Sequence, residues 1–178
     1  MTKWIVDGLI PEGHVVLFLG QPHSTKSRFL EQLAICVASG HRFLGYEGFA
    51  VTQGSVLLID EDTPTDTLEQ RLNRLALGSG VDISNLPFEY RSMNGFLLND
   101  NRQLINLEHD IGQMQPPVVV ILDSLSSMMG RWSENSSSDA LKAAKSWQEL
   151  KSTKATILIA HHMSLKKRSS YQDFEVGS

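Results

Sequence analysis

Short apolar runs alternate along this chain with segments of helical periodicity, and this alternation most constrains the fold. The runs are residues 15–19, 55–59, 118–122 and 155–160. The third reads VVVIL, continuous and rich in β-branched residues, as expected of a strand buried on both faces. Strands that alternate with helices predict crossover connections and a parallel sheet. We therefore predict an α/β fold of three layers around a mainly parallel central sheet.

The intervening segments are predicted as helices because their apolar residues recur three or four positions apart. One helix starts at residue 28 and stops at Gly40, a second covers 64–77, and a third ends before Pro116. A short strand is expected at 88–93, a loop at 126–139 and a further helix at 140–151. Residues 1–14 are predicted to be an irregular lead-in and 164–178 a mobile basic tail, so that residues 1–178 form one domain.

Composition narrows the class of protein. The 178 residues are 41% hydrophobic and 20% charged, as in an ordinary globular domain. Apolar runs are far shorter than the ~20 residues of a membrane span, and a signal-peptide pattern is lacking, so we expect a cytoplasmic protein without membrane contact. The net charge of −4 argues against a broad nucleic-acid-binding surface but allows a local one. The single cysteine, Cys36, cannot form an internal disulfide and is expected to be a buried thiol.

The turn after the first run carries the most informative motif. GQPHSTKS at 20–27 fits the phosphate-binding pattern G-x-x-x-x-G-K-[ST] except at Thr25, where the pattern has glycine. In such a loop Lys26 reaches the β- and γ-phosphates of ATP, and Ser27 Oγ binds Mg²⁺. The residues expected to surround the nucleotide phosphates are Gly20, Gln21, Pro22, His23, Ser24, Thr25, Lys26 and Ser27.

Thr25 leaves alternatives open. A β-branched residue is tolerated at this position if its backbone is helical, but it is strained if φ is positive. The loop is therefore either intact or distorted, with weakened affinity in the second case. An ordinary strand–turn–helix with a surface lysine is the non-functional alternative.

Acidic residues follow two of the other runs. Asp60, Glu61 and Asp62 end the second run and Asp123 ends the third. In open α/β sheets this edge is where ligands bind. Glu61 is the best candidate for polarising the water that attacks the γ-phosphate, and Asp123 for holding Mg²⁺. Alternatively, the acids only solvate the turns and cap the helices that follow.

The last run ends at His161 and His162. Adjacent residues of a strand point to opposite faces, so these histidines are a poor metal pair, but one of them can face the phosphate site. Lys26, Glu61, Asp123 and His162 all follow predicted strands. Because parallel strands end at the same edge of a sheet, we expect the four to converge on one rim.

The order and spacing of several segments resemble the RecA-like P-loop ATPases. The matching segments are LIPEGHVVLFLGQPHSTKS, ASGHRFLG, GSVLLIDEDTPTDTLEQRL, VVVILDSLSSMMG, SENSSSD and ILIAHHMSLK, within residues 9–170. The chain is most similar to the AAA-type subgroup that includes the hexameric replicative helicase of broad-host-range plasmids. This resemblance implies that Glu61 is the catalytic glutamate, Asp123 the magnesium-associated aspartate and His162 a sensor of the γ-phosphate.

The same resemblance implies a ring of identical subunits with loops that face a central pore. Single-stranded DNA would contact these loops, and the candidate phosphate-backbone contacts are Arg131, Lys166, Lys167 and Arg168. A solvated surface cluster is the alternative for these cations. The resemblance also implies a C-terminally incomplete fold, because the family continues into strands that carry an arginine finger.

Three functions remain open from the sequence. The first is an ATP-hydrolysing domain of a DNA helicase or of an accessory ATPase of replication or recombination. The second is a nucleotide-binding module without turnover, as Thr25 and the lack of an arginine finger would suggest. The third is a P-loop kinase, which the acid after the second run and His162 fit less well.

Overall fold

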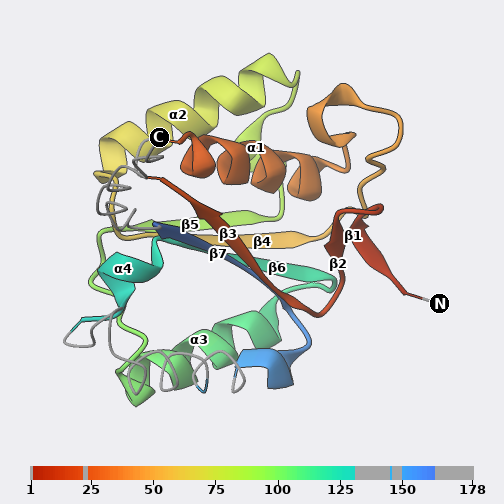
Figure 1. Ribbon diagram of the computed structural model, residues 1–178. Coiled ribbons are helices and arrows are strands. Elements are labelled where there is room, and N and C mark those ends of the chain that lie inside the picture. Colours follow the sequence, from red (N-terminus) through yellow and green to blue (C-terminus); the bar gives the residue numbers. More distant parts are fainter. Residues whose placement is uncertain (1, 22–23, 131–144, 146–149, 163–178) are drawn as a thin grey trace, which may run out of the picture.

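The computed structural model describes residues 2–21, 24–130, 145 and 150–162. Figure 1 shows a central sheet with α1 (Lys26–Ser39) and α2 (Thr65–Gly78) on one face and α3 (Asn101–Gln113) on the other. The predicted three-layer α/β fold is confirmed, and it is consistent with a RecA-like P-loop fold. None of the helices in the described part of the chain is long and apolar enough to cross a membrane.

The main sheet has five parallel strands in the order β3-β7-β6-β4-β5. The strands are β3 (Val15–Gly20), β4 (Ser55–Asp60), β5 (Phe88–Ser92), β6 (Val118–Asp123) and β7 (Thr156–His162). All four predicted apolar runs and the predicted short strand are therefore strands. Because every neighbouring pair is parallel, all five carboxyl ends lie on one rim of the sheet.

The helices begin and end close to the predicted positions. Gly40 ends α1 with a left-handed φ of 75°, and its N–H bonds Cys36 O at 2.8 Å. Part of the expected loop is instead a short helix, α4 (Leu125–Met128), because Leu125 and Met128 are both buried. Short 3₁₀ turns complete the described helical structure: η1 (Phe43–Gly45), η2 (Ile83–Asn85) and η3 (Lys151–Thr153). Most of the helix predicted at 140–151 lies outside the described residues.

The lead-in differs from the irregular segment that was expected. Strand β1 (Trp4–Val6) pairs antiparallel with β2 (Ile10–Pro11), and Gly8 supplies a positive φ of 66° in the turn between them. Ile5 is completely buried, so this small hairpin is part of the core.

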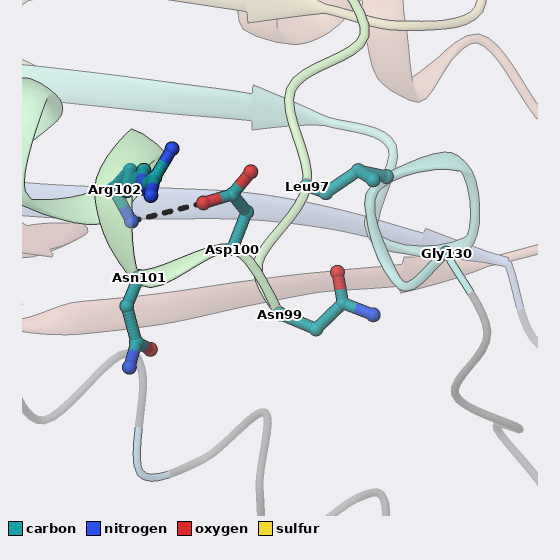
Figure 2. Close-up of a pocket in the computed structure, with 6 residues that line it drawn as sticks. All are labelled: Leu97, Asn99, Asp100, Asn101, Arg102 and Gly130. Atoms are coloured by element: carbon teal, nitrogen blue, oxygen red, sulfur yellow. Dashed lines mark hydrogen bonds between the residues drawn. The ribbon is translucent and has the colours of Figure 1, made fainter.

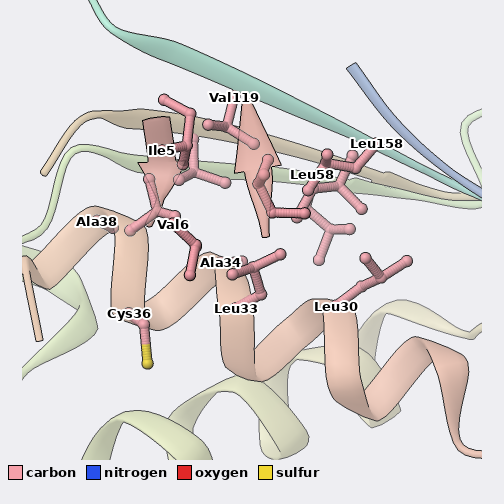
Figure 3. Close-up of a cluster of buried hydrophobic side chains, with 14 of the residues drawn as sticks. Ile5, Val6, Leu30, Leu33, Ala34, Cys36, Ala38, Leu58, Val119 and Leu158 are labelled. Atoms are coloured by element: carbon pink, nitrogen blue, oxygen red, sulfur yellow. The ribbon is translucent and has the colours of Figure 1, made fainter. Parts of the chain in front are cut away.

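Two apolar clusters cover the two faces of the sheet. In Figure 3, Leu30 and Leu33 of α1 pack against Leu58, Val119 and Leu158 of the sheet. On the opposite face, alternate residues of the same strands pack with three leucine or isoleucine side chains of α3: Leu104, Leu107 and Ile111. Each fully buried side chain of this size contributes about 1.5–3 kcal/mol. The buried central strands therefore give rigid support to the rim formed by the carboxyl ends of the strands. Cys36 is buried, as predicted.

Strand β3 lies at one edge of the sheet and is less buried than the other predicted runs. Val16 and Phe18 pack against the α1 cluster, whereas Leu17 and Leu19 are 45% and 54% exposed on the opposite face. The apolar run 15–19 predicted this strand, but it did not predict the exposure of one of its faces. An edge position lowers burial because only one side of the strand has a neighbour.

Candidate functional site

The rim at the carboxyl ends of the strands brings the predicted site segments together. Asp60 of β4 lies in register with Asp123 of β6, and Gly20 of β3 with His162 of β7. The loop 20–27, the acidic turn 60–62 and α4 all begin at this rim (Figure 1). The prediction that these segments converge on one edge is therefore confirmed for the backbone.

Lys26 organises the described part of the loop. Its ammonium group donates to Gly20 O at 3.0 Å, to Gln21 O at 2.8 Å and to Ser24 Oγ at 3.1 Å. The lysine is also the first residue of α1, and Ser27 is the second, so both lie at the positive end of the helix dipole. An anion in this loop would replace the acceptors of the Lys26 ammonium group with its own oxygens. Pro22 and His23 lie outside the described residues.

The backbone at position 25 answers the question that the sequence left open. Thr25 has φ 64° and ψ 12°, which is left-handed rather than helical. This conformation costs a non-glycine residue about 1–2 kcal/mol. Thr25 Oγ1 donates to Ser24 O at 2.6 Å, and Thr25 O accepts the N–H of Phe29 at 3.0 Å, which starts the helix. Of the two alternatives for position 25, the structure therefore has the strained backbone with a positive φ.

At Gly20, in contrast to Thr25, the residue type suits its position in the loop. A Cβ atom at this position would lie 2.8 Å from Ser24 Oγ and 3.3 Å from Lys26 Cδ. A larger residue would therefore force the Ser24 hydroxyl, one of the Lys26 acceptors, to move. Glycine suits this position because the side chains of the loop approach it closely.

The three acids of the turn 60–62 point to three different sets of partners. Asp60 Oδ1 accepts the N–H groups of Asp62 at 2.9 Å and Thr63 at 2.8 Å, which closes the turn after β4. Asp62 accepts hydroxyl hydrogens from Ser124 at 2.7 Å and from Ser127. The N-cap of α2 is Pro64, so the alternative that these acids cap this helix was wrong.

Glu61 turns toward the segment after β5. Its Oε2 accepts the N–H of Gly95 at 2.9 Å, and its Oε1 accepts the N–H of Phe96 at 3.0 Å. Its own N–H donates to Asp123 O at 2.7 Å, which ties the acidic turn to the end of β6. The side chain predicted to act on water is therefore held by two backbone amides in this structure.

Asp123 occupies the position predicted for a magnesium ligand. It is 3% exposed at the end of β6, in register with Asp60. The N-cap of α4 is Ser124, so Asp123 is not the cap that the alternative proposed. Within the described residues, no cluster of three or more histidine, cysteine or acidic side chains could hold a metal. Ser27 and Asp123 offer hard oxygen donors, and Mg²⁺ accepts such a sparse set when water and phosphate complete its shell.

A buried ionic cluster beside the site was missed in the sequence. Arg71 of α2 pairs with Glu31 of α1, and its guanidinium also lies 3.4 Å from Asp60 Oδ2. Burial raises the pKa of Glu31 to about 7, Arg71 and Arg28 oppose this increase, and Asp60 and Asp123 add to it. Burial also raises the pKa of Asp60. The sequence signal that could have revealed this cluster is Glu31, an acidic residue on the apolar face of the first helix.

Strand β7 ends with His161 and His162, two residues beyond the predicted run 155–160. The backbone of His162 pairs in register with Gly20, where the loop begins, and position 162 shares a sheet face with Leu158 and Ala160. His161 occupies the opposite face and is half-buried. The His162 side chain is outside the described part of the structure. The candidate DNA contacts also lie outside it: Arg131, Lys166, Lys167 and Arg168.

A separate hollow of about 630 Å³ lies at the start of α3. Figure 2 shows its lining, in which the Asp100 carboxylate accepts the Arg102 N–H at 2.9 Å and so caps the helix. The other lining residues are Leu97, Asn99, Asn101 and Gly130. These residues differ from all of those predicted for the nucleotide site.

Comparison with known proteins agrees with this geometry. A family model described as AAA domain matches residues 1–168, which include the loop 20–27, both acidic strand ends and both histidines. No significant match was found among curated proteins. The match covers nearly the whole chain, and the strand–loop–helix with Lys26 at its centre lies within it. The chain therefore belongs to the AAA domain family of P-loop ATPase-like proteins.

Proposed function

We propose that this ATP-binding domain hydrolyses ATP in a protein that acts on DNA, as a helicase or as an accessory ATPase of replication or recombination. The observation that supports this most is the position of Lys26. Its ammonium group lies inside the loop at the N-terminus of α1, on the same rim as Glu61 and Asp123. Cationic and amide donors gathered at a helix N-terminus suit the phosphates of a nucleotide.

Each residue has a distinct role in this proposal. Residues 20–27 surround the phosphates, and the Lys26 ammonium group balances the charge of the β- and γ-phosphates. Ser27 and Asp123 hold Mg²⁺, which neutralises charge that develops on the phosphate oxygens. Glu61 orients the attacking water and accepts its proton. His162 senses the γ-phosphate, because its backbone adjoins Gly20 at the beginning of the loop.

The DNA-related part of the proposal rests on the family resemblance and on the local charge. In a homo-oligomeric ring, Arg131 and the three cations at 166–168 would contact the phosphate backbone of single-stranded DNA. Neutralising Lys166, Lys167 and Arg168 together should weaken DNA binding and reduce the slope of log K against log salt. An unchanged slope would indicate that these three cations contact solvent rather than DNA.

The binding step is tested by calorimetric titration of a non-hydrolysable ATP analogue with Mg²⁺. Lys26→Ala should abolish binding because it removes the phosphate cation. Lys3→Ala is the matched control, since Lys3 is an exposed lysine beside the N-terminal hairpin, away from the rim. Equal affinities of the wild type and the Lys26→Ala variant would contradict the assignment of the loop.

A nucleotide-binding module without turnover is the second candidate. It is favoured by the strained Thr25 backbone and by the two hydrogen bonds that the Glu61 carboxylate accepts from backbone N–H groups. Such a module would show nucleotide-dependent thermal stabilisation without release of phosphate. Stimulation of phosphate release by single-stranded DNA would support the first candidate instead.

A further inference from the structure

The Glu61 carboxylate is bound by a segment that packs on the α3 face of the sheet. Its two amide partners, Gly95 and Phe96, lie between β5 and α3, and the Phe96 side chain packs in the apolar cluster beneath α3. The N–H of Leu98 donates to Met128 O of α4 at 2.9 Å, so the segment also contacts α4. The phosphate loop leads instead into α1, which covers the opposite face of the sheet (Figure 1). The segment that binds Glu61 and the helix that follows the loop therefore lie on opposite faces.

The segment that binds this carboxylate is held on several sides. We name residues 93–97 the amide clamp. At its beginning, the N–H of Met93 donates to Asp60 O at 2.9 Å, which joins the clamp to the end of β4. In its middle, Gly95 has a φ of 73°, a left-handed backbone that glycine adopts without strain. Phe96 is 7% exposed and packs in the core with Leu98.

Gln103 of α3 fastens the clamp from behind. Its Oε1 accepts the N–H of Leu97 at 2.9 Å, and its Nε2 donates to Gly95 O at 3.2 Å. One side-chain amide thus bonds both the residue before Phe96 and the residue after it. The bond to Gly95 O restrains the peptide unit that carries the Phe96 N–H, and the bond from Leu97 N–H restrains the unit after it.

We propose that the amide clamp, fastened by Gln103, holds Glu61 in a retracted position, and that hydrolysis requires the carboxylate to leave these two amides. The inference rests on the proposed function, in which Glu61 serves the attacking water. After release, the carboxylate accepts a proton from that water as the water oxygen bonds to the γ-phosphorus and the bond from the γ-phosphorus to the oxygen of ADP breaks. Gln103 is a positioning residue, because it acts on Glu61 only through the clamp.

The clamp itself can be tested without turnover, by hydrogen exchange of backbone amides. Glu61→Gln leaves one side-chain oxygen to accept a hydrogen bond where the carboxylate had two, so exchange at Gly95 and Phe96 should accelerate about tenfold or more. Gln103→Met has nearly the same length but makes neither bond, and it should accelerate the same amides. Gln113→Met, at the exposed last position of the same helix, is the matched control and should leave them unchanged.

The gating role is tested by the effect of Gln103→Met on turnover. We expect kcat to rise severalfold, up to about tenfold, with an unchanged Kd for the non-hydrolysable analogue, because a looser clamp releases Glu61 more often. A merely structural glutamine would not raise kcat. A lower kcat would show that the clamp positions Glu61 for catalysis, and an unchanged kcat would show that it does not limit turnover. Either result overturns the proposal.

A second variant guards against loss of folding. Gln103→Glu keeps the acceptor for the Leu97 N–H but loses the donor to Gly95 O, so a smaller change in the same direction is expected. If the wild type binds the analogue but neither it nor the two Gln103 variants release phosphate, both the hydrolytic function and the gating role are refuted. If the wild type and the Gln103 variants release phosphate at the same rate, only the gating role is refuted.

Discussion

The loop 20–27 and the acidic turn 60–62 lie on the same rim but are built in different ways. In the loop, the partners of Lys26 are Gly20, Gln21 and Ser24, all within six residues of it. In the turn, Glu61 and Asp62 are bonded to groups 34, 35, 62 and 65 residues away, on segments that follow β5 and β6. The difference teaches that the geometry of the loop is encoded locally, whereas the geometry of the acidic turn depends on tertiary packing.

Replacing the proposed catalytic acid should separate the two regions most strongly. Glu61→Gln should lower the hydrolysis rate by about 10²–10⁴, the range for loss of a general base, with nucleotide affinity changed by less than about twofold. Phosphate release and calorimetric titration of the same preparation give the two values. Glu89→Gln, an exposed position on β5, serves as the control. Equal hydrolysis by the wild type and Glu61→Gln would refute the catalytic assignment.

The ionic cluster behind the turn should control stability. Arg71→Met leaves Glu31 and Asp60 buried without their shared cation, so the free energy of unfolding should fall by about 3–5 kcal/mol in urea denaturation. Arg74→Met, an exposed position of the same helix, should change this free energy by less than about 0.5 kcal/mol. A loss below about 1 kcal/mol for Arg71→Met would show that the cluster is not a stabilising link between α1, α2 and β4.

The same cluster predicts a pH dependence. The pKa of Glu31 rises on folding from its ordinary value of 4.5 to about 7, so the folded state binds the proton more tightly. Its contribution to stability is then fully present below pH 4.5 and is lost as pH rises through 7, a change of up to about 3 kcal/mol. Glu31→Gln should remove this dependence. Urea denaturation at pH 5 and pH 8 measures it, and parallel curves for wild type and variant would contradict the prediction.

The smallest effect is expected in the loop itself. Thr25→Gly should raise the free energy of unfolding by about 1 kcal/mol, because glycine adopts the left-handed backbone without the strain that threonine carries. Thr67→Gly is the control with the opposite sign, since Thr67 is exposed within α2 and glycine in place of threonine there should cost about 0.3–0.5 kcal/mol. Thermal unfolding of both variants checks the pair. Destabilisation by Thr25→Gly would show that Thr25 Oγ1 contributes more than the strain costs.

Much of the fold follows from local patterns. Continuous apolar runs such as 118–122 predicted the central strands, and apolar residues at helical spacing predicted α1, α2 and α3 within a few residues. The exposed face of β3 was not predicted, because an apolar run does not reveal whether its strand lies at an edge. The β1–β2 hairpin was also missed, since both strands are too short to show a period of two.

By itself, the sequence determined which residues could do chemistry and that their strands end at one edge, because motif spacing and periodicity depend only on neighbouring residues. Only the tertiary structure decided that Thr25 is left-handed, that Arg71 joins Glu31 to Asp60, and that Glu61 is bound by the clamp at 93–97. These features depend on backbone angles and on contacts between segments far apart in the chain. Such contacts depend on how strands and helices pack, which no single segment encodes.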